Sequence, residues 1–130
     1  MATLWELNSK NCRESFVSWC VVNEQIKLLI SSERVLIIQR NSGNHVRDNL
    51  SLAKVGQCTC TARDNKHAII LELHETPPPP GVQQKPDRHI TLHCNSSKTS
   101  LKIRQEIQYA IDLRTETLFT VNFEQKQNIR

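Results

Sequence analysis

Apolar residues occur in short β-rich runs before residue 95, and at intervals of three and four only after it. Alternation at every second position is typical of a strand with one buried face, whereas a period near 3.6 is typical of an amphipathic helix. The pattern predicts seven strands, at residues 16–22, 25–31, 34–40, 50–55, 57–63, 67–73 and 88–94. Turn-forming Ser, Asn, Asp and Gly residues separate several of these runs.

One helix is predicted after the seventh strand, at residues 98–114. Its apolar residues at helical spacing are Ile103, Ile107, Ala110 and Ile111. Ser96, Ser97 and Thr99 offer N-terminal caps. We expect Ile107 and Ile111 to be buried against the strands, because they lie four residues apart on the only continuous apolar face of the helix.

Seven strands and a terminal helix, with no helix between strands, predict an α+β domain. We expect a seven-stranded, curled antiparallel sheet or partly open barrel, closed by the C-terminal amphipathic helix. This order is similar to the pleckstrin-homology superfold, which hosts many unrelated functions. The predicted organisation is an N-terminal extension or linker at 1–14, the pleckstrin-homology-like domain at 15–115 and a C-terminal tail at 116–130.

The length and charge of the chain narrow the classes of protein it can be. At 130 residues it has the length of one domain, and its net charge of +4 favours anionic surfaces. Basic residues are dispersed and aromatic residues make up 5%, which argues against nucleic-acid binding. No apolar run reaches the length of a membrane span, and the odd number of cysteines favours reduced thiols. We therefore expect a cytoplasmic, monomeric domain.

Catalytic and metal-binding motifs are not recognisable in the sequence. Cys58 and Cys60 share one face of a predicted strand but lack the spacing of a zinc knuckle, so buried structural thiols are favoured. No nucleophile elbow and no glycine-rich phosphate loop are present. We expect neither enzymatic activity nor a bound metal or cofactor.

The run at residues 19–39, WCVVNEQIKLLISSERVLIIQ, together with residues 50–55, 67–73 and 88–111, carries a family resemblance. It resembles the C-terminal pleckstrin-homology-like domain of the vacuolar protein sorting thirteen family of bridge-like lipid transfer proteins. The resemblance covers residues 15–113. It implies the last domain of a very long cytosolic protein, one that docks an end of a lipid conduit on a Golgi or endosomal membrane without carrying lipid itself.

In the pleckstrin-homology fold the first, third and sixth connections gather at the open end, here residues 23–25, 41–47 and 75–87. A tight phosphoinositide pocket is not expected, because the first connection is short and contains Glu24, and Lys27 is the only cation between it and Arg34. A weaker contact with anionic or phosphoinositide-bearing membranes is expected instead. Its candidate residues are Arg40, His45, Arg47, Lys85, Arg88 and His89. The alternative is a solvated rim of mixed charge.

Protein recognition is the rival function, with a small GTPase or an adaptor as the partner. The run Pro77, Pro78, Pro79 and Pro80 is either a polyproline ligand for an SH3, WW or EVH1 domain or a stiff surface loop. Trp19 is expected in the core, and Trp5 is left unassigned.

Overall fold

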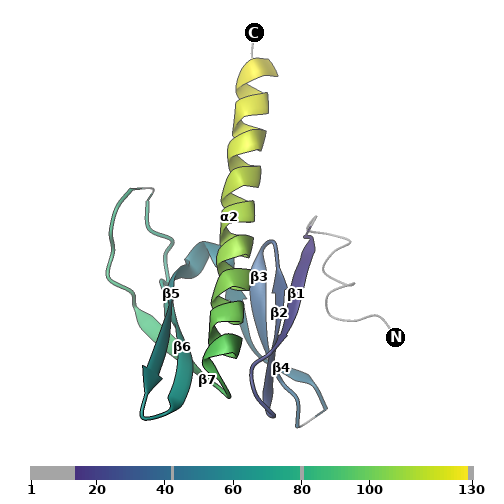
Figure 1. The fold of residues 1–130 in the computed structure, drawn as a ribbon. Coiled ribbons are helices and arrows are strands. Elements are labelled where there is room, and N and C mark those ends of the chain that lie inside the picture. Colours follow the sequence, from purple (N-terminus) through teal and green to yellow (C-terminus); the bar gives the residue numbers. More distant parts are fainter. Residues whose placement is uncertain (1–13, 42, 80, 129–130) are drawn as a thin grey trace.

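The computed structural model describes residues 14–41, 43–79 and 81–128, with side chains described as far as Thr115. These residues form an α+β structure of seven strands and one long helix (Figure 1). The strands are β1 (Phe16–Val21), β2 (Ile26–Ser31), β3 (Arg34–Gln39), β4 (His45–Ser51), β5 (Val55–Arg63), β6 (Lys66–Leu73) and β7 (Arg88–Cys94). A 3-10 turn, η1 (Leu52–Lys54), joins β4 to β5, and the helix is α2 (Ser97–Asn128).

The strands form two antiparallel sheets rather than the single curled sheet expected from the sequence. One sheet has the order β1-β2-β3-β4, and the other has the order β5-β6-β7. The split falls at η1, where the chain leaves one sheet and enters the other. Backbone hydrogen bonds anchor η1 to both sheets, from Leu52 N to Glu33 O at 2.9 Å and from His74 N to Lys54 O at 2.8 Å.

The fourth strand lies earlier in the chain than predicted. β4 begins at His45 and ends at Ser51, whereas the sequence pattern placed this strand at 50–55. Its residues pair with β3 from His45↔Gln39 to Ser51↔Arg34. Cross-strand pairing thus makes a strand of a polar segment whose own β-propensity is low.

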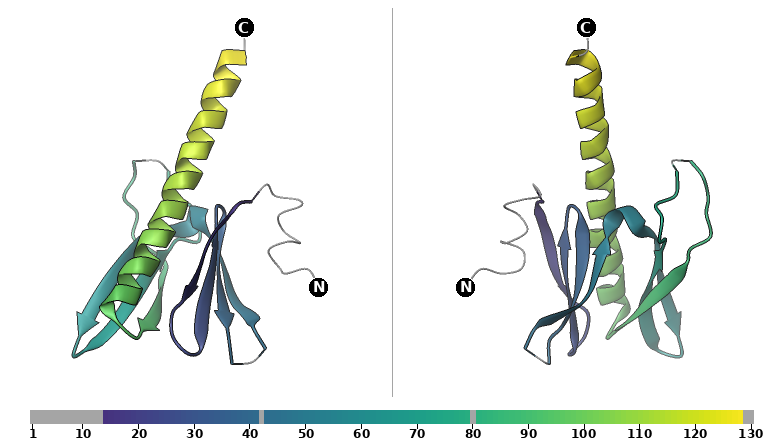
Figure 2. Two further views of the ribbon diagram at one scale, coloured as in Figure 1. Left: turned by 45° about the vertical axis from the view of Figure 1, so that its right-hand side comes forward. Right: turned by 180° about the vertical axis from the view of Figure 1, so that it is seen from behind.

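α2 begins where predicted and ends much later than residue 114. Ser96 is its N-cap, because its Oγ accepts a hydrogen bond from Thr99 N at 3.2 Å. The first half of α2 lies across one side of both sheets, and the second half projects beyond them (Figures 1 and 2). Among the described residues, no helix has an apolar stretch suited to crossing a membrane.

The main core lies between the two sheets and α2. Its largest fully buried side chains are Leu28, Ile30, Ile37, Ile69, Leu71, Ile103 and Ile107. Ile107 is buried as predicted, whereas Ile111 is only half-buried. A smaller cluster of Leu29, Leu36 and Ile38 occupies the opposite face of the larger sheet, so β2 and β3 are apolar on both faces.

Trp19 is not a core residue, contrary to the expectation from sequence. Its neighbours Cys20 and Val22 are buried, whereas Trp19 and Val21 are 47% and 57% exposed. Successive strand residues point to opposite faces, so burial of Cys20 directs Trp19 outward. The Lys27 Nζ lies 4.9 Å from the centroid of the Trp19 ring.

The connections between strands gather differently from the expectation. The first and third lie at one end, where Arg40 N donates to Gln25 O at 2.7 Å. The sixth, at residues 74–87, lies at the other end beside η1 (Figure 1). Each strand reverses the direction of the one before it, so even-numbered connections fall opposite odd-numbered ones.

Candidate anion-binding cleft

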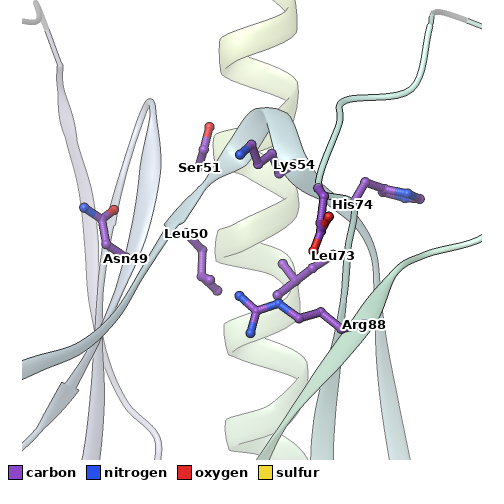
Figure 3. Close-up of a pocket in the computed structure, with 8 residues that line it drawn as sticks. Asn49, Leu50, Ser51, Lys54, Leu73, His74 and Arg88 are labelled. Atoms are coloured by element: carbon purple, nitrogen blue, oxygen red, sulfur yellow. The ribbon is translucent and has the colours of Figure 1, made fainter.

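A cleft of about 550 Å³ opens between the two sheets, on the side away from α2 (Figure 3). It lies where the end of β4 faces the end of β6 and the start of β7. Its lining residues are Asn49, Leu50, Ser51, Lys54, Leu73, His74, Glu75 and Arg88. The cleft exists because the sheets separate at η1.

Backbone pairing fixes the position of both cations of this cleft. Arg88 is the first residue of β7 and pairs with Leu73 of β6. Lys54 is the last residue of η1, and its backbone carbonyl accepts a hydrogen bond from His74 N. The sixth connection is closed at its base, because Asp87 N donates to Leu73 O at 2.8 Å and Asp87 Oδ2 accepts from Glu75 N at 2.7 Å.

Lys54 and Arg88 give the cleft its positive character. In Figure 3 the Lys54 amine and the Arg88 guanidinium both extend toward the space between the sheets. Both side chains are exposed, and neither makes an ion pair within the described ranges. Leu50 and Leu73 are buried and form an apolar base, while Glu75 is the one acidic residue of the lining.

His74 supports the wall of the cleft rather than its opening. Its side chain is buried, and its ring points away from Lys54 and Arg88 in Figure 3. The ring occupies the space beside Gly56, where an added Cβ would lie 2.9 Å from His74 Nε2. Its Nδ1 has no hydrogen-bond partner in the described part of the chain.

The structure does not bring the six predicted cationic residues together. Arg88 lies in the cleft. At the opposite end, Arg40 Nη1 donates to Asn23 O at 2.9 Å, and His45 begins β4. Arg47, within β4, pairs with Asp48, with 3.4 Å between Arg47 Nε and Asp48 Oδ2.

The remaining predicted side chains lie on the sixth connection and on β7. Lys85 is exposed in the connection, and His89 is exposed where β7 pairs with Glu72. Pro77 and Pro79 are exposed and Pro78 is half-buried, while Pro80 lies outside the described residues. A turn follows, with Gly81 at a φ of 79° and a hydrogen bond from Val82 N to Pro79 O at 3.1 Å.

Lys54 is the residue of the cleft that the sequence analysis missed. Assigning residues 50–55 to one strand concealed it. The signal was a break in spacing, since Leu50 and Leu52 are two apart but Val55 follows three later. A change of phase of this kind indicates that the strand is interrupted.

The thiols of Cys20, Cys58 and Cys94 are protonated at neutral pH. Burial raises the pKa of Cys58 from 9.0 to about 11 and also raises the pKa values of Cys20 and Cys94. Because the thiolate is the reactive form, these three thiols are poor nucleophiles. No group of three or more His, Cys, Asp and Glu side chains close enough to hold a metal occurs in the part of the chain that the structure describes.

Neither a protein-family model nor a curated protein sequence matches this chain.

Proposed function

We propose that this chain is a pleckstrin-homology-like, non-catalytic module that docks a larger protein weakly on an anionic membrane. The observation that carries the proposal is the cleft at which Lys54 and Arg88, unpaired within the described ranges, face the same opening above an apolar base. Lipid head groups supply phosphate and carboxylate oxygens to such cations, and acyl chains near the head group suit apolar residues.

The fold supports the first part of this proposal. Four and three antiparallel strands, followed by a helix lying across both sheets, are compatible with a pleckstrin-homology-like domain. The resemblance to the vacuolar protein sorting thirteen family supports the identity of the larger protein, which would be a lipid transfer protein with this domain at its C-terminal end. Such a parent would place one end of its conduit on a Golgi or endosomal membrane.

The number of cations makes the contact weak. Each Lys or Arg near an anionic bilayer contributes about 1 kcal/mol, so Lys54 and Arg88 together contribute about 2 kcal/mol. Glu75 opposes them. A contact of this strength becomes useful when other parts of a long parent bind the same membrane, because linked contacts raise the effective concentration of each.

Vesicle flotation tests the proposal with neutral phosphatidylcholine vesicles and with phosphatidylserine-rich or phosphoinositide-bearing vesicles, each at low and high salt. We expect binding to the anionic vesicles that weakens with salt. The double substitution Lys54→Ala and Arg88→Ala should lower the partition coefficient about 30-fold, the equivalent of the 2 kcal/mol above.

The matched control is Arg63→Ala with Lys66→Ala. These exposed residues pair at the β5–β6 turn, away from the cleft, and their removal changes the net charge equally. Equal losses for the two double variants would show a diffuse charge effect and remove the cleft from the proposal. Sub-micromolar, head-group-selective binding would overturn the weak contact.

Protein docking is the second candidate function, with a small GTPase or an adaptor as partner. Pro77 and Pro79 are exposed on the sixth connection, as presentation to an SH3, WW or EVH1 domain requires. The turn after Pro79 limits the extended segment that these residues can offer. Binding of an SH3 domain that is lost in Pro77→Ala with Pro79→Ala is the test of this alternative.

A further inference from the structure

The free edge of β1 has unpaired backbone groups. β1 is the outer strand of its sheet in the described residues and pairs on one side with β2. Val22 N donates to Ile26 O at 2.9 Å, and hydrogen-bonded pairs recur at every second residue of an antiparallel ladder. Cys20 therefore bonds to β2, whereas the N–H and C=O groups of Trp19 and Val21 point toward the free edge.

A groove lies along this edge, against the start of α2. Its volume is about 290 Å³, and its walls are residues 19–21 of β1 and the first two turns of α2. Ile103 is fully buried at its base. Trp19 and Val21 are among the most exposed large apolar side chains of the described residues. An unprotected edge of this kind is a template for pairing with another extended chain.

The charge of the groove selects the partner. Lys98 and Lys102 line it from α2, both exposed, and neither makes an ion pair with a described residue. Lys27 lies over the Trp19 ring, on the face of the sheet away from α2, and does not line the groove. Glu106, one turn beyond Lys102, is the opposing charge on α2. The N-terminal end of the helix contributes further positive potential.

We infer that this groove binds an extended acidic peptide segment of a partner protein, which adds a strand to β1. Side chains alternate along an added strand, so one set lies beside Trp19 and Val21 and the other faces Lys98 and Lys102. The structure therefore assigns an alternating sequence to the ligand, with apolar residues on the first face and Asp or Glu on the second. This surface is separate from the cleft of Lys54 and Arg88.

A second open edge makes a useful comparison. β5 is also an outer strand among the described residues, and a groove of about 280 Å³ separates it from α2. Its lining is Gln57, Cys58, Thr59, Cys60, Arg104 and Gln108. This groove has one cation and no exposed aromatic side chain, so it lacks the features that favour an acidic, apolar strand. Ligand binding there would contradict the assignment to β1.

The probe is a fluorescein-labelled, end-capped eight-residue peptide of alternating Glu and Val, measured by fluorescence anisotropy with the full chain. A Lys–Val peptide and a Glu–Val peptide interrupted by proline are the comparison probes. We expect the Glu–Val peptide to bind and both comparison peptides to bind at least tenfold more weakly. Equal binding of the Lys–Val peptide, or no binding of any peptide, would overturn the inference.

Three variants locate the binding site. Lys98→Glu with Lys102→Glu should weaken binding at least tenfold, whereas Arg63→Glu with Lys66→Glu, an equal change of charge elsewhere, should not. Val21→Pro removes an N–H that faces the free edge, so it should abolish binding without breaking the β1–β2 ladder. Circular dichroism checks that each variant is folded. Lys54→Ala with Arg88→Ala should leave peptide binding intact, which separates this result from that of the membrane proposal.

Amide hydrogen exchange gives the direct readout. On addition of the Glu–Val peptide, the amides of Trp19 and Val21 should become protected, because they acquire partners in the added strand. Protection at residues 57–60 instead would move the site to β5. If phosphatidylserine-rich vesicles bind through Lys98 and Lys102 while the peptide does not, the surface is a membrane contact and strand addition is wrong.

Discussion

The Asn23 side chain joins the two sheets by donating from Nδ2 to His93 O at 2.8 Å. Asn23 lies in the connection after β1, and His93 lies near the end of β7, seventy residues later. The Oδ1 of the same side chain accepts from Gln25 N at 2.7 Å and from Ile26 N at 2.9 Å. The Asn23 side chain thus shapes the β1–β2 hairpin and also links it to the second sheet. No described strand of one sheet forms a backbone ladder with a strand of the other.

We predict that Asn23→Ala destabilises the domain by about 1–3 kcal/mol, because three hydrogen bonds are lost. Asn23→Asp separates the two roles. It keeps the oxygen that the hairpin needs and replaces the donor to His93 O with a second acceptor. Urea denaturation should therefore show a smaller loss for Asn23→Asp than for Asn23→Ala, yet a measurable one. Wild-type stability in Asn23→Asp would show that the link between the sheets contributes nothing.

The contact between Gly56 and His74 leads to a second prediction. A Cβ on Gly56 would meet His74 Nε2 at 2.9 Å, and the His74 ring is buried, so it has little room to move. Gly56→Ala should cost about 1–3 kcal/mol, the usual range for overpacking. In a His74→Ala background the same change should cost much less, because the space is vacated. Equal costs in the two backgrounds, measured by thermal denaturation, would contradict the proposed clash.

Six of the strands were predictable because each is a local run of β-forming residues, whereas β4 is a polar segment and was misplaced. The prediction failed for two properties that the local sequence pattern does not determine, namely which face of a strand is buried and which strands pair with each other. β1 carries apolar residues in both phases of the alternation, with Val17, Trp19 and Val21 in one phase and Phe16 and Cys20 in the other, so sequence alone did not reveal which face is buried. Burial of Cys20 beneath α2 settles it. The division into two sheets was equally hidden, since hydrogen-bond partners are set by tertiary structure.

The candidate cleft was half predictable. Arg88 stood out as a cation at the start of a clear strand, whereas Lys54 was assigned to a strand that the structure interrupts with η1. Arg40 and His45 were grouped with Arg88 on the assumption that their connections meet, but these connections lie at opposite ends. Two connections lie close together only if their strands run in the directions that bring them to the same end of the sheet. The pattern of apolar residues does not show these directions.

The helix provides a graded test of core packing. Ile107 is fully buried between the sheets, whereas Ile111, one turn later, is half-buried. Ile107→Ala should cost about 2–5 kcal/mol and Ile111→Ala clearly less, because a partly exposed site leaves a smaller cavity. Chemical denaturation of the two variants measures the difference. Equal losses would show that the helix packs more deeply at Ile111 than the structure indicates.

The buried thiol of Cys58 predicts a loss of stability at high pH. Burial raises its pKa from 9.0 to about 11, against a smaller lowering by Arg104. The folded state therefore holds the thiol proton more tightly than the unfolded chain. The contribution is fully present below about pH 9 and is lost as the pH rises through 11, since the unfolded chain releases its proton first.

Comparison of the wild type with Cys58→Val isolates this titration, because every other ionisable group is present in both proteins. Valine keeps an apolar side chain at the site, so its cost at neutral pH is a baseline for the pH series. Between pH 8 and about pH 10.5, in the presence of a reductant, the wild type should lose about 2 kcal/mol more unfolding free energy than the variant. If the two proteins lose stability in parallel, Cys58 is hydrated enough to ionise in the folded state, and its place in the core between β5 and α2 is wrong.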